Sequence, residues 1–188
     1  VMGLTDNVDH CRRLARVLSI PLTADADTGY GNPLNVHYTV KLFEEAGVAG
    51  VNIEDQVNPK RCGHMPGKEV IAIEEMQKKI EAACLARRDD DFMIIARTDS
   101  LAMEGMEGAL RRVAAYAEAG ADMIFPEAPG AKDDIARVVE AARVPVTINT
   151  SFNVHEEPII NKPEEALKAL DQGRVDFLVT EKGLYTKA

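Results

Sequence analysis

The chain has 188 residues, 46% of them hydrophobic and 28% charged, which is the composition of an ordinary globular protein. Its 22 lysines and arginines face 31 aspartates and glutamates, and the formal net charge of -9 argues against nucleic acid or an anionic membrane as a partner. We expect neither a membrane span nor a signal peptide, and three cysteines are too few for a disulfide framework. The sequence therefore predicts one cytoplasmic domain over residues 1–188.

Short apolar runs alternate with longer segments of helical periodicity, a pattern typical of repeated β/α units. The expected strands are Pro21 to Asp25, Gly50 to Ile53, Phe92 to Ala96, Met123 to Phe125, Val144 to Ile148 and Val175 to Val179. The expected helices are Asn7 to Leu18, Leu34 to Ala46, Ile73 to Arg88, Met106 to Ala119, Lys132 to Ala142 and Pro163 to Asp171. Asn32 before Pro33 is typical of a helix start. Glycines that suit left-handed helix ends follow three of the helices, at Gly47, Gly120 and Gly173.

The spacing of these strands favours a closed barrel over an open sheet. Strand starts lie about 31 residues apart, and eight such units need about 250 residues, the usual size of a (β/α)8 barrel. An open doubly wound sheet often carries a glycine-rich phosphate turn after its first strand, and none follows the first strand here. We therefore expect an α/β fold of the TIM-barrel type, in an incomplete fragment with about six βα units.

Acidic residues follow the first two expected strands. The first strand runs into Asp25 and Asp27, and the second runs into Glu54. Parallel strands end at one edge of a sheet, so these carboxylates would share a small volume, where their repulsion is costly unless protons or a cation neutralise it. A hard divalent cation, Mg²⁺ or Mn²⁺, suits an all-oxygen donor set. The alternative is that these acids are solvated turn residues.

Further polar residues follow the later strands. Arg97 is a candidate clamp for a carboxylate or phosphate, because its guanidinium makes forked hydrogen bonds; the alternative is a salt bridge to the neighbouring acids. The next strands add Glu127 and the neutral donor Asn149. Charges of both signs at one rim predict a small, multiply charged anionic substrate, bound through a metal and an arginine.

A long loop after Glu54, about 17 residues before the next helix, has the glycine and proline content of a binding loop or lid. Inside it, Cys62 is flanked by Lys60, Arg61 and His64, and nearby positive charge favours the thiolate. Cys62 is therefore a candidate acid/base. A zinc ligand and an inert thiol are the alternatives, but the loop lacks the second ligand pair that a structural zinc site needs.

Five segments together resemble the isocitrate lyase/phosphoenolpyruvate mutase superfamily in order and spacing: Ala24 to Gly31, Asn52 to Gln56, Lys60 to His64, Ala96 to Asp99 and Phe125 to Ala128. The resemblance covers about residues 1 to 150. The Lys-Arg-Cys-Gly-His segment is similar to the lyase branch, which includes methylisocitrate lyase and 2,3-dimethylmalate lyase.

The resemblance implies roles for individual residues. The Mg²⁺ ligands, direct or through water, would be Asp25, Asp27 and Glu54. Catalysis would involve Cys62 as the acid/base, with His64, Arg97 and Glu127. Substrate contacts would come from Arg97 and from Lys60, Arg61, Gly63, His64 and Asn149.

The resemblance also implies an activity: Mg²⁺-dependent cleavage of a 2-hydroxy-polycarboxylate into a 2-oxo acid and a carboxylate or dicarboxylate, in a homotetramer. The close alternatives are oxaloacetate hydrolysis or decarboxylation and a phosphonopyruvate-type reaction of the same superfamily. A non-catalytic acid-binding remnant is the alternative from another class of protein.

Overall fold

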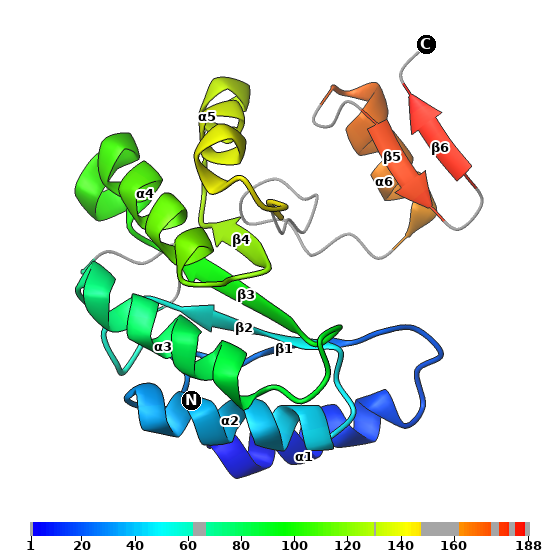
Figure 1. Ribbon diagram of the computed structural model, residues 1–188. Helices are drawn as coiled ribbons and strands as arrows, with labels where there is room; N and C mark the ends of the chain where they lie inside the picture. Colours follow the sequence, from blue (N-terminus) through cyan, green and yellow to red (C-terminus); the bar gives the residue numbers. More distant parts are fainter. Residues whose placement is uncertain are drawn as a thin grey trace. The chain divides into compact units, whose positions relative to one another are not determined.

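The computed structural model describes residues 2–61, 67–129, 131–147, 162–173, 177–180 and 183–186 (Figure 1). The chain divides into two compact units, Val1–Ile148 and Asn149–Ala188, each of which is described by itself. The single domain expected over residues 1–188 stays a prediction. Among the helices of the described ranges, none combines the length and the apolar character that crossing a membrane would require.

The first unit alternates helices with strands that form one parallel sheet. Its helices are α1 (Leu4–Ala15), α2 (Pro33–Glu45), α3 (Ile73–Ala86), α4 (Leu101–Glu118) and α5 (Lys132–Ala142). Its strands are β1 (Thr23–Asp25), β2 (Gly50–Glu54), β3 (Met93–Thr98) and β4 (Met123–Pro126). The strand order is β1-β2-β3-β4 and every neighbouring pair is parallel, which confirms the predicted βα alternation.

The fifth expected strand, Val144 to Ile148, continues this sheet as an isolated bridge. Val146 pairs in parallel with Ile124 of β4. The Ile124 amide donates to the Pro145 carbonyl at 3.0 Å, and the Thr147 amide donates to the Ile124 carbonyl at 2.9 Å. The described part of this segment therefore lies beside β4, as the sequence predicts.

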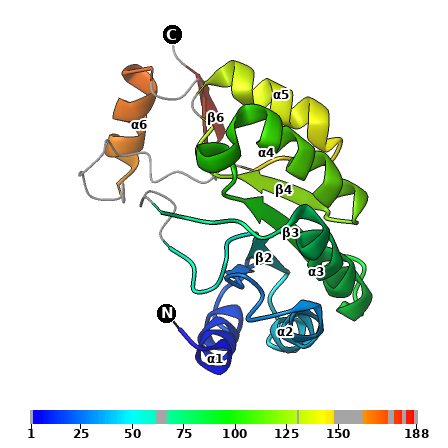
Figure 2. The same ribbon diagram turned by 90° about the vertical axis from the view of Figure 1, so that its left-hand side faces the viewer.

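The hydrophobic core lies between the sheet and the helices, which lie along its outer side (Figure 2). Val51, Ile53, Ile94 and Ile124 of the strands are buried together with Phe43 of α2. Each such side chain contributes about 1.5–3 kcal/mol on burial. The core holds the strands in register, so that Asn52 of β2 pairs with Asp25 of β1 and Glu54 of β2 pairs with Arg97 of β3.

Local signals account for several helix boundaries, but α1 begins and ends three residues before the expected Asn7 to Leu18. The Asn32 side chain caps α2 by accepting from the amides of Leu34 and Asn35 at 3.0 and 3.2 Å, with Pro33 in the first turn. The three helix-end glycines all have positive φ, as predicted. Helix α4 begins at Leu101, five residues before the expected start, because the chain is helical on both sides of a kink at Gly105 (φ 66°).

The second unit contains α6 (Pro163–Asp171), β5 (Phe177–Thr180) and β6 (Gly183–Thr186). The strand predicted from Val175 to Val179 is present in its described part as β5, but the parallel pairing expected for it is wrong, because β5 pairs antiparallel with β6. Only two residues of the sequence separate these strands, and a parallel pair needs a crossover connection of about a dozen residues or more.

Candidate active site

The turn after β1 brings two acids to the carboxyl end of the sheet. The Asp27 amide donates to Asp25 Oδ1 at 2.8 Å, and the Asp27 carbonyl accepts from the Glu54 amide at 2.9 Å, which ties the turn to β2. Gly29 has φ +83°, and a Cβ there would lie 2.4 Å from Val36 Cγ2. Only glycine fits this position, so the Asp-x-Asp-Thr-Gly sequence fixes where both carboxylates lie.

Glu54 is the most buried acid of the three, with 2% of its surface exposed. Burial raises the pKa of Glu54 to about 7, although the charges of Lys60 and Arg97 oppose the rise. Its Oε2 lies 3.7 Å from Lys60 Nζ and 3.4 Å from Arg97 Nε, whereas its buried Oε1 has no hydrogen-bond partner among the residues that the structure describes. A buried carboxylate oxygen without a partner is costly, and a bound cation would remove this cost.

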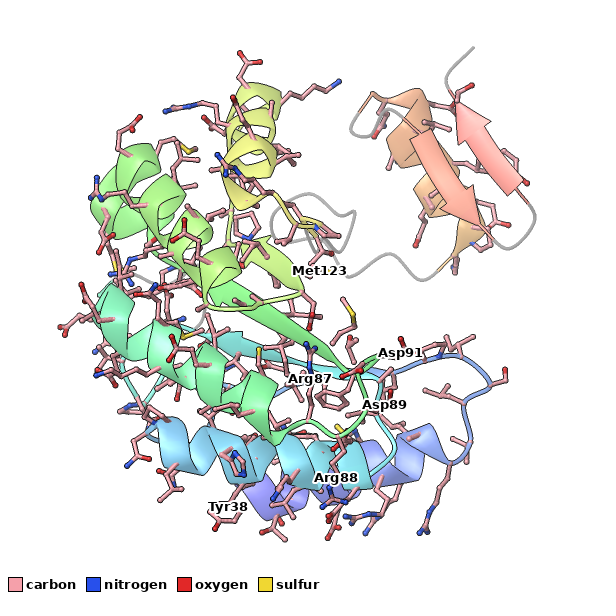
Figure 3. All side chains as sticks on the ribbon, viewed as in Figure 1. Tyr38, Arg87, Arg88, Asp89, Asp91 and Met123 are labelled. Atoms are coloured by element: carbon pink, nitrogen blue, oxygen red, sulfur yellow. The ribbon has the colours of Figure 1, made fainter. Side chains whose placement is uncertain are left out.

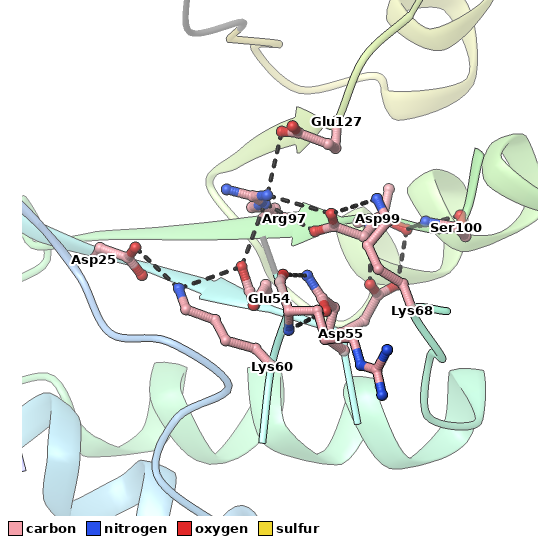
Figure 4. A network of polar contacts seen from close by, with 12 residues as sticks. Asp25, Glu54, Asp55, Lys60, Lys68, Arg97, Asp99, Ser100 and Glu127 are labelled. Atoms are coloured by element: carbon pink, nitrogen blue, oxygen red, sulfur yellow. Dashed lines mark hydrogen bonds and ion pairs between the residues drawn. The ribbon is translucent and has the colours of Figure 1, made fainter. Parts of the chain in front are cut away.

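Lys60 joins all three acids. Its Nζ lies 2.5 Å from Asp27 Oδ1, 3.2 Å from Asp25 Oδ2 and 3.7 Å from Glu54 Oε2. Figure 4 shows the contacts with Asp25 and Glu54. Burial disfavours the ammonium, but the hydrogen bond to Asp27 and the charges of Glu54 and Asp25 outweigh burial and hold the pKa of Lys60 above its usual value. The three predicted metal ligands therefore converge on one positive charge supplied by the loop.

Arg97 links the acids of three strand ends. Its Nε and Nη2 donate to the two carboxylate oxygens of Asp99 at 2.9 and 3.2 Å. Nη2 also lies 3.3 Å from Glu127 Oε2, and the guanidinium stands 5.1 Å from the centre of the Phe125 ring. Burial disfavours its charge, yet these acids and Glu54 hold the pKa of Arg97 above its usual value. The predicted alternative, a salt bridge to neighbouring acids, is thus present.

A buried network under this rim includes functional-site candidates that the sequence reading missed. Asp55 accepts from Thr98 Oγ1 and Tyr116 OH, both at 2.7 Å, and from the Asp99 amide at 3.0 Å. Burial raises the pKa of Asp55, and these hydrogen bonds and Arg112 oppose the rise. Asp99 also pairs with Lys68 at 3.1 Å. Asp55 and Asp99 each occupy a strand end, the same signal that identified Glu54 and Arg97.

The loop stem is held close to this rim. The Gln56 side chain accepts from the Arg61 amide at 3.0 Å and donates to the Arg61 carbonyl at 2.9 Å. The structure thus brings together Asp25, Asp27, Glu54, Lys60, Arg97 and Glu127, with Arg61 in the anchored stem. Four predicted site residues lie outside the described residues: Cys62, Gly63, His64 and Asn149.

The donor set fits a divalent cation in its chemistry. Within the described ranges, no three acidic, histidine or cysteine side chains form a group with the geometry to hold a metal ion. The three carboxylates nevertheless offer only oxygen ligands, converge on a single cation and leave Glu54 Oε1 without a partner. In this structure the three carboxylates contact the Lys60 ammonium.

Sequence comparisons place the chain in a family. The family model for phosphoenolpyruvate phosphomutase matches residues 1–175. The chain is 48% identical over 154 residues to probable 2-methylisocitrate lyase 2 of Corynebacterium glutamicum. This alignment covers 81% of this chain and 50% of that protein. The chain is 38% identical over 200 residues to 2,3-dimethylmalate lyase of Eubacterium barkeri, which covers 100% of this chain and 69% of that protein. The chain thus spans half or somewhat more of the length of these relatives.

Solved structures agree. Oxaloacetate acetylhydrolase in complex with the inhibitor 3,3-difluorooxalacetate superposes with a TM-score of 0.77 and 38% identity, covering 90% of this chain and 58% of that chain. Phosphonopyruvate hydrolase in complex with oxalate and Mg²⁺ superposes with a TM-score of 0.69 and 39% identity, and the match covers 79% of this chain and 52% of that chain. These relatives are of the TIM-barrel type, and the parallel α/β sheet matches theirs, so the predicted fold class and the predicted resemblance are both confirmed. The chain belongs to the phosphoenolpyruvate mutase/isocitrate lyase superfamily.

Proposed function

We propose that this chain acts as a Mg²⁺-dependent carbon–carbon lyase on a 2-hydroxy-polycarboxylate of the methylisocitrate or dimethylmalate type. The products would be a 2-oxo acid and a carboxylate or dicarboxylate. The observation that carries the proposal is the convergence of Asp25, Asp27, Glu54 and Arg97 at the carboxyl end of one parallel sheet. The names of the two curated relatives, both lyases, support the reaction class.

Asp25, Asp27 and Glu54 would hold the Mg²⁺ ion, with Mn²⁺ as a substitute. When bound, the ion supplies Lewis-acid stabilisation of negative charge on the oxygens of the 2-hydroxy acid and of the 2-oxo acid product. Glu54 is positioned for this role because its Oε1 is buried without a partner, and Asp27 because the turn at Gly29 fixes its place.

Arg97 would bind a carboxylate of the substrate. Its Nε and Nη2 are occupied by Asp99, Glu54 and Glu127, whereas in the part of the chain that the structure describes its Nη1 makes no hydrogen bond. The acids around it hold the guanidinium in one orientation with this donor available. An arginine fixed in this way recognises a carboxylate with little loss of side-chain entropy, and it stabilises negative charge that develops during bond cleavage.

Cys62 would donate the proton to the departing anion. This role rests on the resemblance of the Lys-Arg-Cys-Gly-His segment to the lyase branch. The residue immediately before it, Arg61, is held on both sides of its backbone by Gln56. Lys60 and Arg61 add positive charge to the same stem, which favours binding of the anionic fragment that Cys62 would protonate.

Oxaloacetate cleavage is the second candidate function. It is favoured by the likeness to oxaloacetate acetylhydrolase, whose structure superposes with a TM-score of 0.77. The same metal ligands and Arg97 would bind oxaloacetate, because this compound also carries an oxygen next to a carboxylate. The two candidates differ in the bond that is cleaved, so product analysis separates them.

The test is an incubation of the Mg²⁺-loaded chain with 2-methylisocitrate, 2,3-dimethylmalate, oxaloacetate and phosphonopyruvate in parallel. We expect pyruvate and succinate from 2-methylisocitrate, or pyruvate and propionate from 2,3-dimethylmalate. A coupled dehydrogenase assay measures pyruvate, and chromatography measures the second product. Oxalate and acetate, or pyruvate and CO₂, from oxaloacetate alone would select the second candidate. Phosphate release from phosphonopyruvate alone would contradict both, and no turnover of any compound would indicate a non-catalytic acid-binding protein.

A substitution tests the role of Cys62. Cys62→Ser should lower the rate of turnover by about 10²–10⁴, the usual contribution of a positioned acid or base, while leaving Mg²⁺ affinity unchanged. Cys84→Ser is the matched control, because Cys84 lies on α3 and donates to the Gly120 carbonyl, at a distance from the site in the fold. Full activity of Cys62→Ser would remove this thiol from the mechanism.

A further inference from the structure

The Lys60 ammonium lies among the three carboxylates, where a bound metal ion would place its positive charge. The ammonium contacts the carboxylates of Asp25, Asp27 and Glu54 at 3.2, 2.5 and 3.7 Å. These are the same three side chains that the proposed function assigns to Mg²⁺. The Lys60 side chain is 26% exposed and the Glu54 side chain is 2% exposed, so the ammonium reaches a buried carboxylate. Figure 4 shows its contacts with Asp25 and Glu54.

The stem of the loop delivers this ammonium to the cluster. The Val57 amide donates to the Glu69 carbonyl at 2.8 Å, and the Ile71 amide donates to the Asp55 carbonyl at 2.9 Å, so both ends of the loop are tied together. Gln56 then fixes the backbone of Arg61, the residue after Lys60, with two hydrogen bonds. Lys60 therefore reaches the acids from a constrained backbone rather than from a free surface loop.

A divalent ion and this ammonium exclude each other at the cluster. Mg²⁺ binds oxygen ligands at about 2.0–2.1 Å and demands near-octahedral geometry. The ammonium lies within 3.7 Å of an oxygen of each carboxylate and would repel the ion at close range. This explains why the described acids converge on one point and yet lack the geometry of a metal site.

We propose that Lys60 is a tethered competitor of the metal ion: in the metal-free protein its ammonium contacts Asp25, Asp27 and Glu54 and offsets part of their charge, and a divalent cation binds only by displacing it. The proposal rests on the proposed function, which places the metal at these three acids. Displacement has a second consequence, because it frees a positive charge on the loop stem that is then available to the anionic substrate.

The first test measures metal affinity. Mn²⁺ titrations by calorimetry compare the unmodified chain with Lys60→Met, which keeps the side-chain length and removes the charge. If the ammonium occupies the cluster in about nine of ten molecules, its removal tightens the apparent Kd about tenfold. Lys78→Met is the matched control, because this substitution changes the net charge by the same amount. Lys78 is exposed on α3, and no contact between it and the three acids is present among the described residues.

The outcomes separate this proposal from the proposed function. Tighter binding in Lys60→Met, with Lys78→Met unchanged, supports competition. Equal or weaker binding in Lys60→Met overturns competition and leaves the metal site standing. Absence of Mn²⁺ binding from all three proteins overturns the metal site and the competition with it.

The second test distinguishes displacement from a general change in local charge. The unmodified chain is acetylated with and without saturating Mg²⁺, and mass spectrometry follows the modification of Lys60 relative to Lys78. We expect Lys60 to be protected without metal and to react several-fold faster with it, because its ammonium has left the carboxylates. Unchanged or lower reactivity of Lys60 at saturating Mg²⁺ would show that the ion binds without displacing it and would overturn the proposal.

Discussion

The two ends of the parallel sheet carry charge in different ways. At the end where the strands begin, Arg87 pairs with Asp122 at 2.5 Å, and Asp122 also accepts from the Ile94 amide at 2.8 Å. Glu44 accepts from the backbone amides of Arg88 and Asp89 at 2.9 and 2.8 Å. Figure 3 shows Arg87, Arg88 and Asp89 grouped in the connection between α3 and β3. Asp122 thus has an arginine of its own, and Glu44 is bound by two amides through Oε1, although its Oε2 is buried without a partner among the described residues.

At the end where the strands finish, the charges are shared and incompletely matched. One lysine, Lys60, serves three acids, and one arginine, Arg97, serves Glu54, Asp99 and Glu127. Glu54 is 2% exposed, whereas Glu44 is only partly buried, and Glu54 Oε1 has no hydrogen-bond partner among the described residues. The difference teaches that the first end contributes to stability, whereas the second holds an arrangement that a ligand would complete.

The largest effect on stability is expected beneath the second end. Arg112 lies under the rim, where it donates to Tyr116 OH and the Ile71 carbonyl, both at 2.9 Å, and pairs with Glu104 at 2.6 Å. Arg112→Met would leave buried Asp55 without its positive neighbour, so it should lower the free energy of unfolding by about 3–5 kcal/mol. Urea denaturation measures the change.

The control for this prediction lies on the same helix. Arg111 is exposed, and Arg111→Met should change the free energy of unfolding by about 0.5 kcal/mol or less. If Arg112→Met lowers the free energy of unfolding no more than Arg111→Met does, the buried network around Asp55 does not stabilise this end of the sheet.

A smaller effect of opposite sign is expected at Glu54. Because its pKa rises from 4.5 to about 7 on folding, the folded protein holds this proton more tightly than the unfolded chain. Stability from this group is therefore present below pH 4.5 and is lost as the pH rises through 7. At pH 8, with EDTA present, Glu54→Gln should raise the free energy of unfolding by up to about 3 kcal/mol.

The pH dependence provides the check on this prediction. Urea denaturation at pH 5 and pH 8 should show a smaller difference between the two pH values for Glu54→Gln than for the unmodified chain. A destabilised Glu54→Gln protein at pH 8 would mean that the carboxylate is already fully compensated, and the contrast between the two ends would fail.

The smallest effect is expected at the first end of the sheet. Arg88 Nη2 pairs with Glu45 Oε1 at 2.9 Å, with 63% and 51% of the two side chains exposed. Such a pair contributes about 0–1 kcal/mol, so Arg88→Ala should change the free energy of unfolding by that amount and leave metal affinity unchanged. A loss well above this range, or an altered metal affinity, would show that the two ends are coupled.

Much of the site was predictable from the sequence because strand ends are visible there. Apolar runs that stop at Asp25, Glu54 and Arg97 identify the carboxyl edge of a parallel sheet, and the structure brings these residues together. Glycines with positive φ follow three of the six described helices, and these helix ends were predictable for the same local reason.

The rest depended on side-chain direction and loop conformation. Glu54 and Asp55 are consecutive acids, and successive side chains of a strand point to opposite faces, so the sequence does not reveal that Asp55 enters a buried network with Arg112 and Tyr116. The position of Lys60 follows from the backbone of the loop stem, which no periodicity encodes. The β5–β6 pair was missed because Gly183–Thr186 is short and has no clear alternation.

The most direct test of the central claim is a Mn²⁺ titration of the EDTA-stripped chain, with free Mn²⁺ followed by electron paramagnetic resonance. The claim predicts one tightly bound ion per chain, competed by Mg²⁺, and loss of this binding in a variant that combines Asp27→Asn with Glu54→Gln. Retention of tight binding in that variant, or absence of binding in the unmodified chain, would contradict the claim that the carboxyl-end acids hold the catalytic cation.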